Sequence, residues 1–283
     1  MKTAMTEARK ARPGDLPALE ALNQRAYRRL PRLWWWDEHL TDDLFIVVER
    51  GGTLVGALFA YPDESPVAWV RLAVLDDHCD VEEWLDLALP PILDRLRHHG
   101  TQALAWMDHG EWAGPYLKAR GYRRMAEVVT LIKFDHAVPE PGTGGADVRL
   151  RPAAERDFAT VTAIDQAAFA PHWWHSAATL RRRAAASSHF AVAELAGAVA
   201  GYAEGEVHPS TAHLNRVAVH PAHQGRGLGT LLLCDALRAF WRQGAQQVTL
   251  NTQTDNHKSR QLYRRCGFEP TGDTVTAWEL RFA

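Results

Sequence analysis

The sequence predicts an α/β protein built from two tandem copies of one fold, each a mixed, mostly antiparallel sheet flanked by helices. Stretches of β-favouring residues alternate with stretches in which apolar residues recur at helical spacing. The same order of predicted elements occurs twice along the chain. With 283 residues, there is room for two domains of ordinary size.

The two copies begin alike. Residues 8–15 resemble residues 147–154, and each segment opens with a short strand and a proline that lead into an amphipathic helix. The helices end near Tyr27 and Phe169. A tryptophan cluster and then a hairpin follow each helix. These lie at 34–36 and 45–56 in the first copy, and at 173–174 and 190–201 in the second.

Both copies also end alike, with a glycine, an aromatic residue and a final strand. These are Gly121-Tyr122 with a strand ending at Phe134, and Gly267-Phe268 with a strand ending at Phe282. Between the copies, proline and glycine are frequent, which is typical of a linker. We therefore predict an N-terminal domain at 1–138, a linker at 139–146 and a C-terminal domain at 147–283.

The second copy has the clearer pattern. Phe158, Val161 and Ile164 form the apolar face of its first helix, and Gly244 ends its long helix. The predicted strands are 147–151, 189–195, 198–208, 212–219 and 248–251. The predicted helices are 154–168, 176–187, 227–243 and one that Gly267 closes.

A glycine-rich loop connects the strand at 212–219 to the long helix. Gly225, Gly227 and Gly229 allow positive φ and a close approach of the backbone to a ligand. N–H groups at a helix start, together with the helix dipole, favour an anion, and Arg226 adds a cation. A Walker loop would need Gly-Lys-Ser/Thr, and a Rossmann loop would need G-x-G-x-x-G. The pattern therefore indicates a phosphate site of another kind, or an ordinary glycine-rich turn.

Residues 224–229 resemble the Q/R-x-x-G-x-G/A loop of the GNAT superfamily of N-acetyltransferases. In that family, the loop holds the pyrophosphate of acetyl-CoA, and the sheet opens between the strand before the loop and the next strand. The resemblance implies two tandem GNAT folds and acetyl-CoA as cosubstrate. It also implies cofactor-binding roles for Val217, Ala218, Val219, Gln224, Gly225, Arg226, Gly227, Leu228, Gly229 and Thr230.

A second motif, at 255–268, is similar to the family pattern N-x-x-A/S-x-x-L-Y-x-x-x-G-F. The resemblance places Asn256 and Ser259 near the pantetheine and Tyr263 near the thioester sulfur. A phenol can donate a proton to a departing thiolate, so Tyr263 is the expected general acid. Tyr263 as a purely structural residue is the alternative.

Two further roles complete acetyl transfer. A fixed backbone N–H at 217–219 is expected to stabilise the oxyanion. The general base is His213, at a position where many family members have glutamate, with Glu206 and His208 on the preceding strand as rivals. A water chain in place of a base, or a structural role for His213, stays open.

The first copy lacks these features. Its matching strand, at 69–74, is followed by an acidic segment, at 75–83, instead of glycines. Like charges there would repel a pyrophosphate. Asp80 is expected to cap a helix at 81–99. Leu117 stands where the second copy has Tyr263, with Tyr116 out of register. We therefore predict that the first copy is degenerate and does not bind acetyl-CoA.

Composition limits the other possibilities. A net charge of −2 argues against a broad nucleic-acid surface, and no apolar run is long enough to span a membrane. The absence of a signal-peptide pattern and the three scattered cysteines indicate a reducing compartment, the cytoplasm. His172 and His175 lack nearby acidic or cysteine partners, so no metal is predicted. The arginines at 181–183 are expected to form a solvated helix face, or to face the CoA nucleotide.

These features predict an acetyl-CoA-dependent N-acetyltransferase whose C-terminal domain transfers acetyl to a primary amine by direct attack. The acceptor is a small molecule or a protein N-terminus, and no nucleic acid or membrane partner is expected. The arrangement resembles that of mycothiol synthase, which also pairs a degenerate GNAT domain with an active one. The alternative is a non-catalytic acyl-CoA-binding regulatory or scaffold protein.

Overall fold

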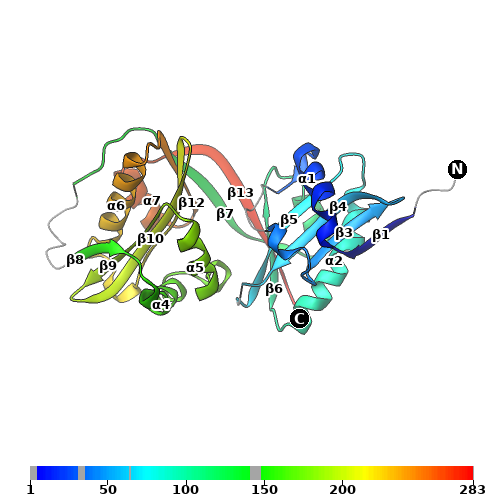
Figure 1. Ribbon diagram of the computed structural model, residues 1–283, viewed down its shortest axis with the longest axis horizontal. Coiled ribbons are helices and arrows are strands. Elements are labelled where there is room, and N and C mark those ends of the chain that lie inside the picture. The colour runs from blue at the N-terminus through cyan, green and yellow to red at the C-terminus, as the bar shows by residue number, and fades with distance from the viewer. Residues whose placement is uncertain (1–4, 31–35, 64, 141–147, 283) are drawn as a thin grey trace. The chain divides into compact units, whose positions relative to one another are not determined.

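The computed structural model describes residues 5–30, 36–63, 65–140 and 148–282. The chain forms two compact units, which are shown in Figure 1. Unit 1 consists of residues 1–126 and 275–283, and unit 2 of residues 127–274. Each unit is a mixed, mostly antiparallel sheet flanked by helices, which confirms the predicted fold class. Among the described residues, no helix is long and apolar enough to cross a membrane.

Unit 1 has the strand order β1-β3-β4-β5-β6-β13, and among its described strands only β5 and β6 pair in parallel. A two-residue strand, β2 (Arg28–Arg29), also pairs with β5. The remaining elements are β1 (Thr6–Lys10), α1 (Leu16–Arg25), β3 (Phe45–Arg50), β4 (Thr53–Tyr61), β5 (Val67–Leu75), α2 (Val81–His98), β6 (Ala103–Asp108) and α3 (Gly114–Ala119).

Unit 2 has the order β7-β12-β11-β10-β9-β8, with β11 and β12 as its parallel pair. Its elements are β7 (Arg123–Lys133), β8 (Val148–Pro152), α4 (Phe158–Ala168), α5 (Ala177–Ala186), β9 (His189–Leu195), β10 (Ala198–His208), β11 (Thr211–Val219), α6 (Leu228–Arg242), β12 (Gln247–Gln253), α7 (His257–Arg265) and β13 (Glu269–Arg281), whose second half belongs to unit 1.

The repeat extends to side-chain contacts. In both units, an arginine of the first strand pairs with the aspartate just before the first helix and with a glutamate of the neighbouring strand. The residues are Arg9, Asp15 and Glu49 in unit 1, and Arg151, Asp157 and Glu194 in unit 2. The hydrogen bonds from Arg151 lower the pKa of Asp157 to about 2. The two copies therefore share structural contacts as well as topology.

The final strands do not close their own copies. β7 follows α3 of the first copy, but its residues 128–133 pair with β12 in unit 2. β13 follows α7 of the second copy, but its residues 276–281 pair with β6 in unit 1. Figure 1 shows both strands, in green and red, continuing from one unit into the other. Alternating apolar residues specify which face of a strand is buried, and several partner strands satisfy the same pattern.

The units therefore divide at 126 and 274, whereas the sequence analysis placed the division between 138 and 147. Most of the predicted linker, residues 141–146, lies outside the described residues, as do Trp34 and Trp35 of the first tryptophan cluster.

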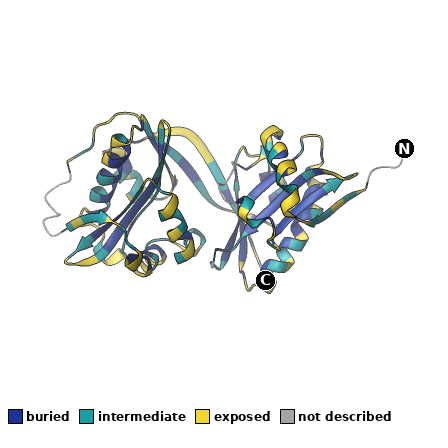
Figure 2. Cartoon of the chain, viewed as in Figure 1, coloured by how far each residue is buried: buried dark blue, intermediate teal, exposed yellow. Residues whose placement is uncertain are grey.

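In unit 2, helices cover both faces of the sheet, so the central strands are buried on both sides (Figure 2). On one face, Leu233, Leu237 and Phe240 of α6 pack against Leu214 of β11. On the other face, α4 packs against β10 and β11 through a cluster that includes Phe158, Val161, Tyr202 and Ala218. Leu214 and Ala218 of β11 face different layers although they are four residues apart, because the ladder with β10 has one extra residue between them.

Candidate active site

The two parallel strands of unit 2 pair over only part of their length. Thr211–Leu214 of β11 pairs with Gln247–Leu250 of β12, and the pairing stops there although both strands continue. Asn215 is an extra residue in the β10–β11 ladder, because Glu204 pairs with Arg216 and Gly205 with Leu214. Such a bulge turns the strand away from its neighbour. The sheet therefore opens after Leu214, where the sequence analysis expected it to open.

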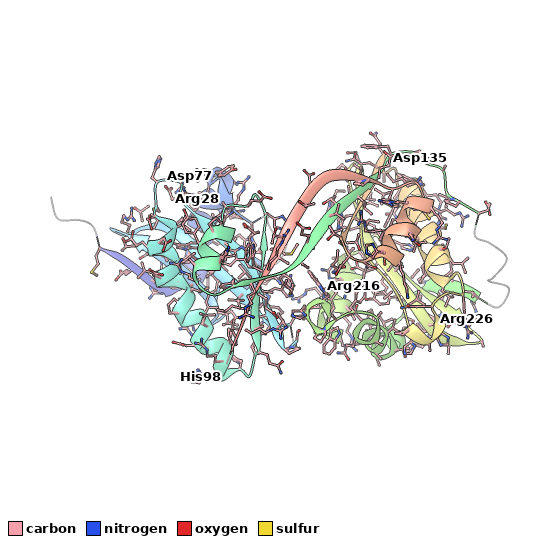
Figure 3. All side chains as sticks on the ribbon, turned by 180° about the vertical axis from the view of Figure 1, so that it is seen from behind. Arg28, Asp77, His98, Asp135, Arg216 and Arg226 are labelled. Atoms are coloured by element: carbon pink, nitrogen blue, oxygen red, sulfur yellow. The ribbon has the colours of Figure 1, made fainter. Side chains whose placement is uncertain are left out.

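The glycine loop lies at the end of the open strand. Gly225 has φ 78° and Gly227 has φ 83°, values that a residue with a Cβ rarely adopts. Gly227 is the N-cap of α6, and the first bond within the helix runs from Leu231 N–H to the Gly227 carbonyl at 3.0 Å. The N–H groups before Leu231 therefore point out of the helix and favour an anion. Arg226, labelled in Figure 3, is exposed beside them.

Helix α7 carries the predicted acid. The Asn256 side chain accepts a hydrogen bond from Ser259 N–H at 3.3 Å and so caps the helix. Tyr263 is buried, and its ring packs edge-on against Phe268 with centroids 5.9 Å apart. Burial raises the pKa of Tyr263 to about 12, while the charge of Arg216 opposes the rise. The phenol therefore stays protonated at neutral pH and can donate.

The His213 side chain lies on the face of the sheet that helices α4 and α5 cover. Its Nδ1 lies 2.8 Å from Thr249 Oγ1, and that hydroxyl donates to the Ala212 carbonyl at 3.3 Å. This network assigns the proton to Nδ1 and leaves Nε2 as an acceptor. Burial, with the charges of Arg183 and His208, lowers the pKa of His213 to about 4. His213 is thus neutral at pH 7 but a weak base.

The rival bases lie on the neighbouring strand. Glu206 is directly opposite His213 in the β10–β11 register. His208 Nε2 is 3.8 Å from Glu206 Oε1. The structure therefore brings the three predicted bases together at one end of the two strands.

The sequence analysis missed a second carboxylate on this face, Glu204. Its side chain is buried and accepts hydrogen bonds from Arg183 Nη1 at 3.2 Å and from Asn215 Nδ2 at 3.1 Å. Burial raises the pKa of Glu204, which makes it a stronger base than an exposed glutamate. Arg183 is thus paired with the sheet, although its side chain is 35% exposed. The available signal was the alternation along β10, which places Glu204 on the face of Tyr202 and Glu206.

The segment between α4 and α5 is tied to the sheet. Trp174 Nε1 donates to the Phe169 carbonyl at 2.9 Å. His175 N–H donates to Asp165 Oδ1 at 2.9 Å, and its Nε2 lies 3.2 Å from Arg216 Nη1. Among the described residues, no group of three or more His, Cys, Asp or Glu is arranged to hold a metal ion.

Unit 1 opens at the matching place but has different surroundings. β5 and β6 pair only from Val67–Ala103 to Trp69–Ala105. Trp106 follows directly, and its ring centroid lies 6.4 Å from that of Trp84 and 6.2 Å from that of Trp112, which are 6.1 Å apart.

The acidic residues after β5 are engaged within unit 1. Asp80 caps α2 by accepting from Glu83 N–H at 2.9 Å, as the sequence predicted. Asp77 accepts from Tyr27 N–H at 3.1 Å. The Glu83 carboxylate itself lies 2.9 Å from Arg50. These residues therefore serve the local fold of unit 1.

Comparison with known proteins agrees with this geometry. The model of the acetyltransferase (GNAT) family matches residues 155–268, which contain α4 to α7 and the glycine loop. N-alpha-acetyltransferase RimI of Mycobacterium tuberculosis is 37% identical over 103 residues, which are 35% of this chain and 63% of that protein. The chain thus covers less than two thirds of this relative.

Two solved structures resemble the whole chain. A tandem GNAT protein from the clavulanic acid biosynthesis pathway is 19% identical, with a TM-score of 0.69 and coverage of 98% of both chains. A GCN5-related N-acetyltransferase from Sphaerobacter thermophilus is 16% identical, with a TM-score of 0.67 and coverage of 98% of this chain and 95% of that one. Residues 155–268 are thus similar to the acetyltransferase (GNAT) family, and the whole chain has the fold of tandem GNAT proteins.

Proposed function

We propose that unit 2 transfers an acetyl group from acetyl-CoA to a primary amine by direct attack. The observation that carries the proposal is the opening after Leu214, which leads straight to the N–H groups of the glycine loop. An extended pantetheine arm fits an open strand edge, and a pyrophosphate fits a helix start. One continuous path therefore offers both kinds of contact that acetyl-CoA needs.

The residues along this path fit the cosubstrate. The backbone of Val217, Ala218 and Val219 would bind the pantetheine arm as a strand does, and a fixed N–H there would stabilise the oxyanion. The loop from Gln224 to Thr230 would hold the pyrophosphate. Loop positions Gly225 and Gly227 meet no atom within 4 Å where a Cβ would stand, so the backbone is accessible.

Tyr263 is the proposed general acid. It donates to the thiolate of CoA as the carbon–sulfur bond breaks, and its pKa of about 12 keeps it protonated until then. For the base we propose the group formed by His213, Glu206 and Glu204. Within this group, Glu204 has the raised pKa that a general base needs, whereas the lowered pKa of His213 makes it the weaker acceptor.

Mass spectrometry of acetylated products tests the proposal. The probes are a hexapeptide with a free α-amino group, an N-blocked lysine peptide and spermidine, each with acetyl-CoA and the full chain. The α-amino probe follows from the name of the M. tuberculosis relative. Tyr263→Phe should lower the rate about 100-fold and change the Kd for acetyl-CoA less than about twofold.

Tyr116→Phe is the matched control, because Tyr116 is the out-of-register tyrosine of unit 1. It should keep the wild-type rate. Acetyl-CoA binding without turnover on any amine would instead support a non-catalytic acyl-CoA-binding protein. Equal rates for wild type and Tyr263→Phe would remove Tyr263 from the mechanism.

A further inference from the structure

A buried ion pair lies beside the open strand of unit 2. Arg216 Nε is 2.7 Å from Asp165 Oδ2, and Nη2 is 3.2 Å from Oδ1. Asp165 is fully buried and also accepts from the Tyr202 hydroxyl and from His175 N–H. Asp165 is on α4, Tyr202 on β10 and Arg216 on β11, so one carboxylate connects three elements.

Arg216 also holds the segment between α4 and α5. Its guanidinium donates to the Trp173 carbonyl, lies 3.2 Å from His175 Nε2 and stacks 3.9 Å from the centre of the Phe169 ring. Figure 3 labels Arg216 close to the helices of this layer. The guanidinium fork is rigid, so several partners fix its orientation together.

Unit 1 builds the same fold without this pair. The repeated contacts of Asp15 and Asp157 align α1 with α4, which places Asn23 at the position of Asp165. The same register, with a bulge in both sheets, places Leu72 at the position of Arg216. Ala57 replaces Tyr202 by the same alignment. The ion pair is therefore not required for the fold, and it occurs in the unit that carries the glycine loop.

Its location links it to the chemistry. Arg216 lies on the open stretch of β11 after Leu214 and directly precedes Val217, the first residue of the proposed pantetheine-binding edge. The Arg216 charge also acts on Tyr263, since it opposes the rise in the pKa of that phenol. Arg216 thus stands on the open strand and contacts the segment at 169–176, and its charge acts on the proposed acid.

We propose that Asp165 and Arg216 are positioning residues for acetyl transfer. They hold the open end of β11 and the segment at 169–176 in one fixed relation, so that an amine and the acetyl group meet in a reactive geometry. The inference rests on the proposed acetyl transfer in unit 2. A small misplacement of reacting groups costs about 100-fold in rate, which is the effect expected when the pair is lost.

The double variant Asp165→Asn/Arg216→Leu recreates the residues found in unit 1. Replacing both members leaves no unpaired buried charge, so the chain should fold. Arg151→Leu/Asp157→Asn is the matched control, because it removes the same type of ion pair in the same unit, at a position where both units have it. Arg216→Lys keeps the charge without the fork and should give an intermediate result.

Hydrogen exchange of the full chain is the first measurement, and it requires no acceptor. The double variant should exchange at least about tenfold faster at 169–176 and 215–219, with unit 1 unchanged. The control should leave both segments at wild-type rates. Unchanged exchange in the double variant overturns the proposal.

Kinetics with the acetylated probe give the second measurement. The double variant should lose about 100-fold in kcat/KM, mostly in kcat, and keep the Kd for acetyl-CoA within about fivefold. Faster exchange with wild-type kinetics would mean that the ion pair is purely structural. That result would overturn this inference and leave the proposed acetyl transfer standing. A wild type that transfers acetyl to no probe would overturn the proposed function, and this inference with it.

Discussion

Units 1 and 2 have the same opening in the sheet and surround it differently. In unit 1, Trp84, Trp106 and Trp112 pack where β5 and β6 separate. In unit 2, β12 continues beyond the corresponding position with polar residues, and β11 leads to the glycine loop. The opening is therefore a property of the fold, because both copies keep it. The function depends on the residues placed around it.

The two helix starts differ in the same way. Asp80 caps α2 with its own carboxylate, so the anion at that helix start belongs to the protein. Gly227 caps α6 without a side chain and leaves the N–H groups to an external anion. One side chain at the N-cap thus separates a self-satisfied helix from the proposed phosphate site.

The largest effect should come from a carboxylate in the glycine loop. Gly227→Glu adds both a strained backbone at φ 83° and a negative charge, and should weaken acetyl-CoA binding more than about 100-fold. Gly197→Glu is the control, because Gly197 has φ 81° in the β9–β10 turn of the same unit. Titration calorimetry should give one site per wild-type chain. Two sites would show that unit 1 also binds.

Next in size is the loss of a tryptophan from unit 1. Trp106→Leu should cost about 3 kcal/mol of stability, because it removes much of a fully buried ring. Leucine is the residue at the same register position in unit 2, Leu250. Urea unfolding gives the cost, and calorimetry should still count one acetyl-CoA site. A second site would show that the tryptophans alone keep the cosubstrate out of unit 1.

The pH dependence of stability tests the surroundings of His213. In unit 1, Trp69 occupies the matching position. The folded pKa of about 4 lies below the unfolded value of 6.5, so the unfolded chain binds the proton more tightly. Stability is therefore lost as pH falls from 6.5 towards 4, by about 2 kcal/mol at pH 5. Between pH 7 and pH 5, the free energy of unfolding of His213→Gln should fall by about 2 kcal/mol less than that of wild type. Parallel pH profiles would contradict the half-buried, neutral His213.

The smallest effect concerns the helix cap of unit 1. Asp80→Ala should destabilise unit 1 by about 1 kcal/mol, since it removes the hydrogen bond to Glu83 N–H. The difference in unfolding free energy between Asp80→Ala and Asp80→Asn measures the contribution of the cap, because Asn keeps the hydrogen-bond acceptor. Acetyl-CoA binding should be unchanged in both. Tighter binding would show that Asp80 repels a cosubstrate in unit 1.

Local patterns predicted the elements of unit 2 well. Strands at 189–195 and 198–208 have the predicted bounds, and the helix expected at 227–243 runs from Leu228 to Arg242. Glycine punctuation and apolar periodicity act within a few residues, so a sequence displays them. The opening of the sheet was expected through the family resemblance and not from periodicity.

Partners far apart in the sequence were not predicted. Asp165 and Arg216 belong to different elements, and each alone is an ordinary polar residue in a helix or a strand. Glu204 was passed over in favour of Glu206 for the same reason. The exchange of β7 and β13 was not predicted, because the residue pattern of a strand does not specify which strand it pairs with. Which contacts form depends on tertiary packing.

The strand exchange also sets an order of assembly during synthesis. Residues 127–274 are continuous in the chain, so unit 2 has all its strands before residue 275 is added. β6 pairs with β13 and must wait for it with an unpaired edge. The unit encoded later is thus the first whose strands have all been synthesised.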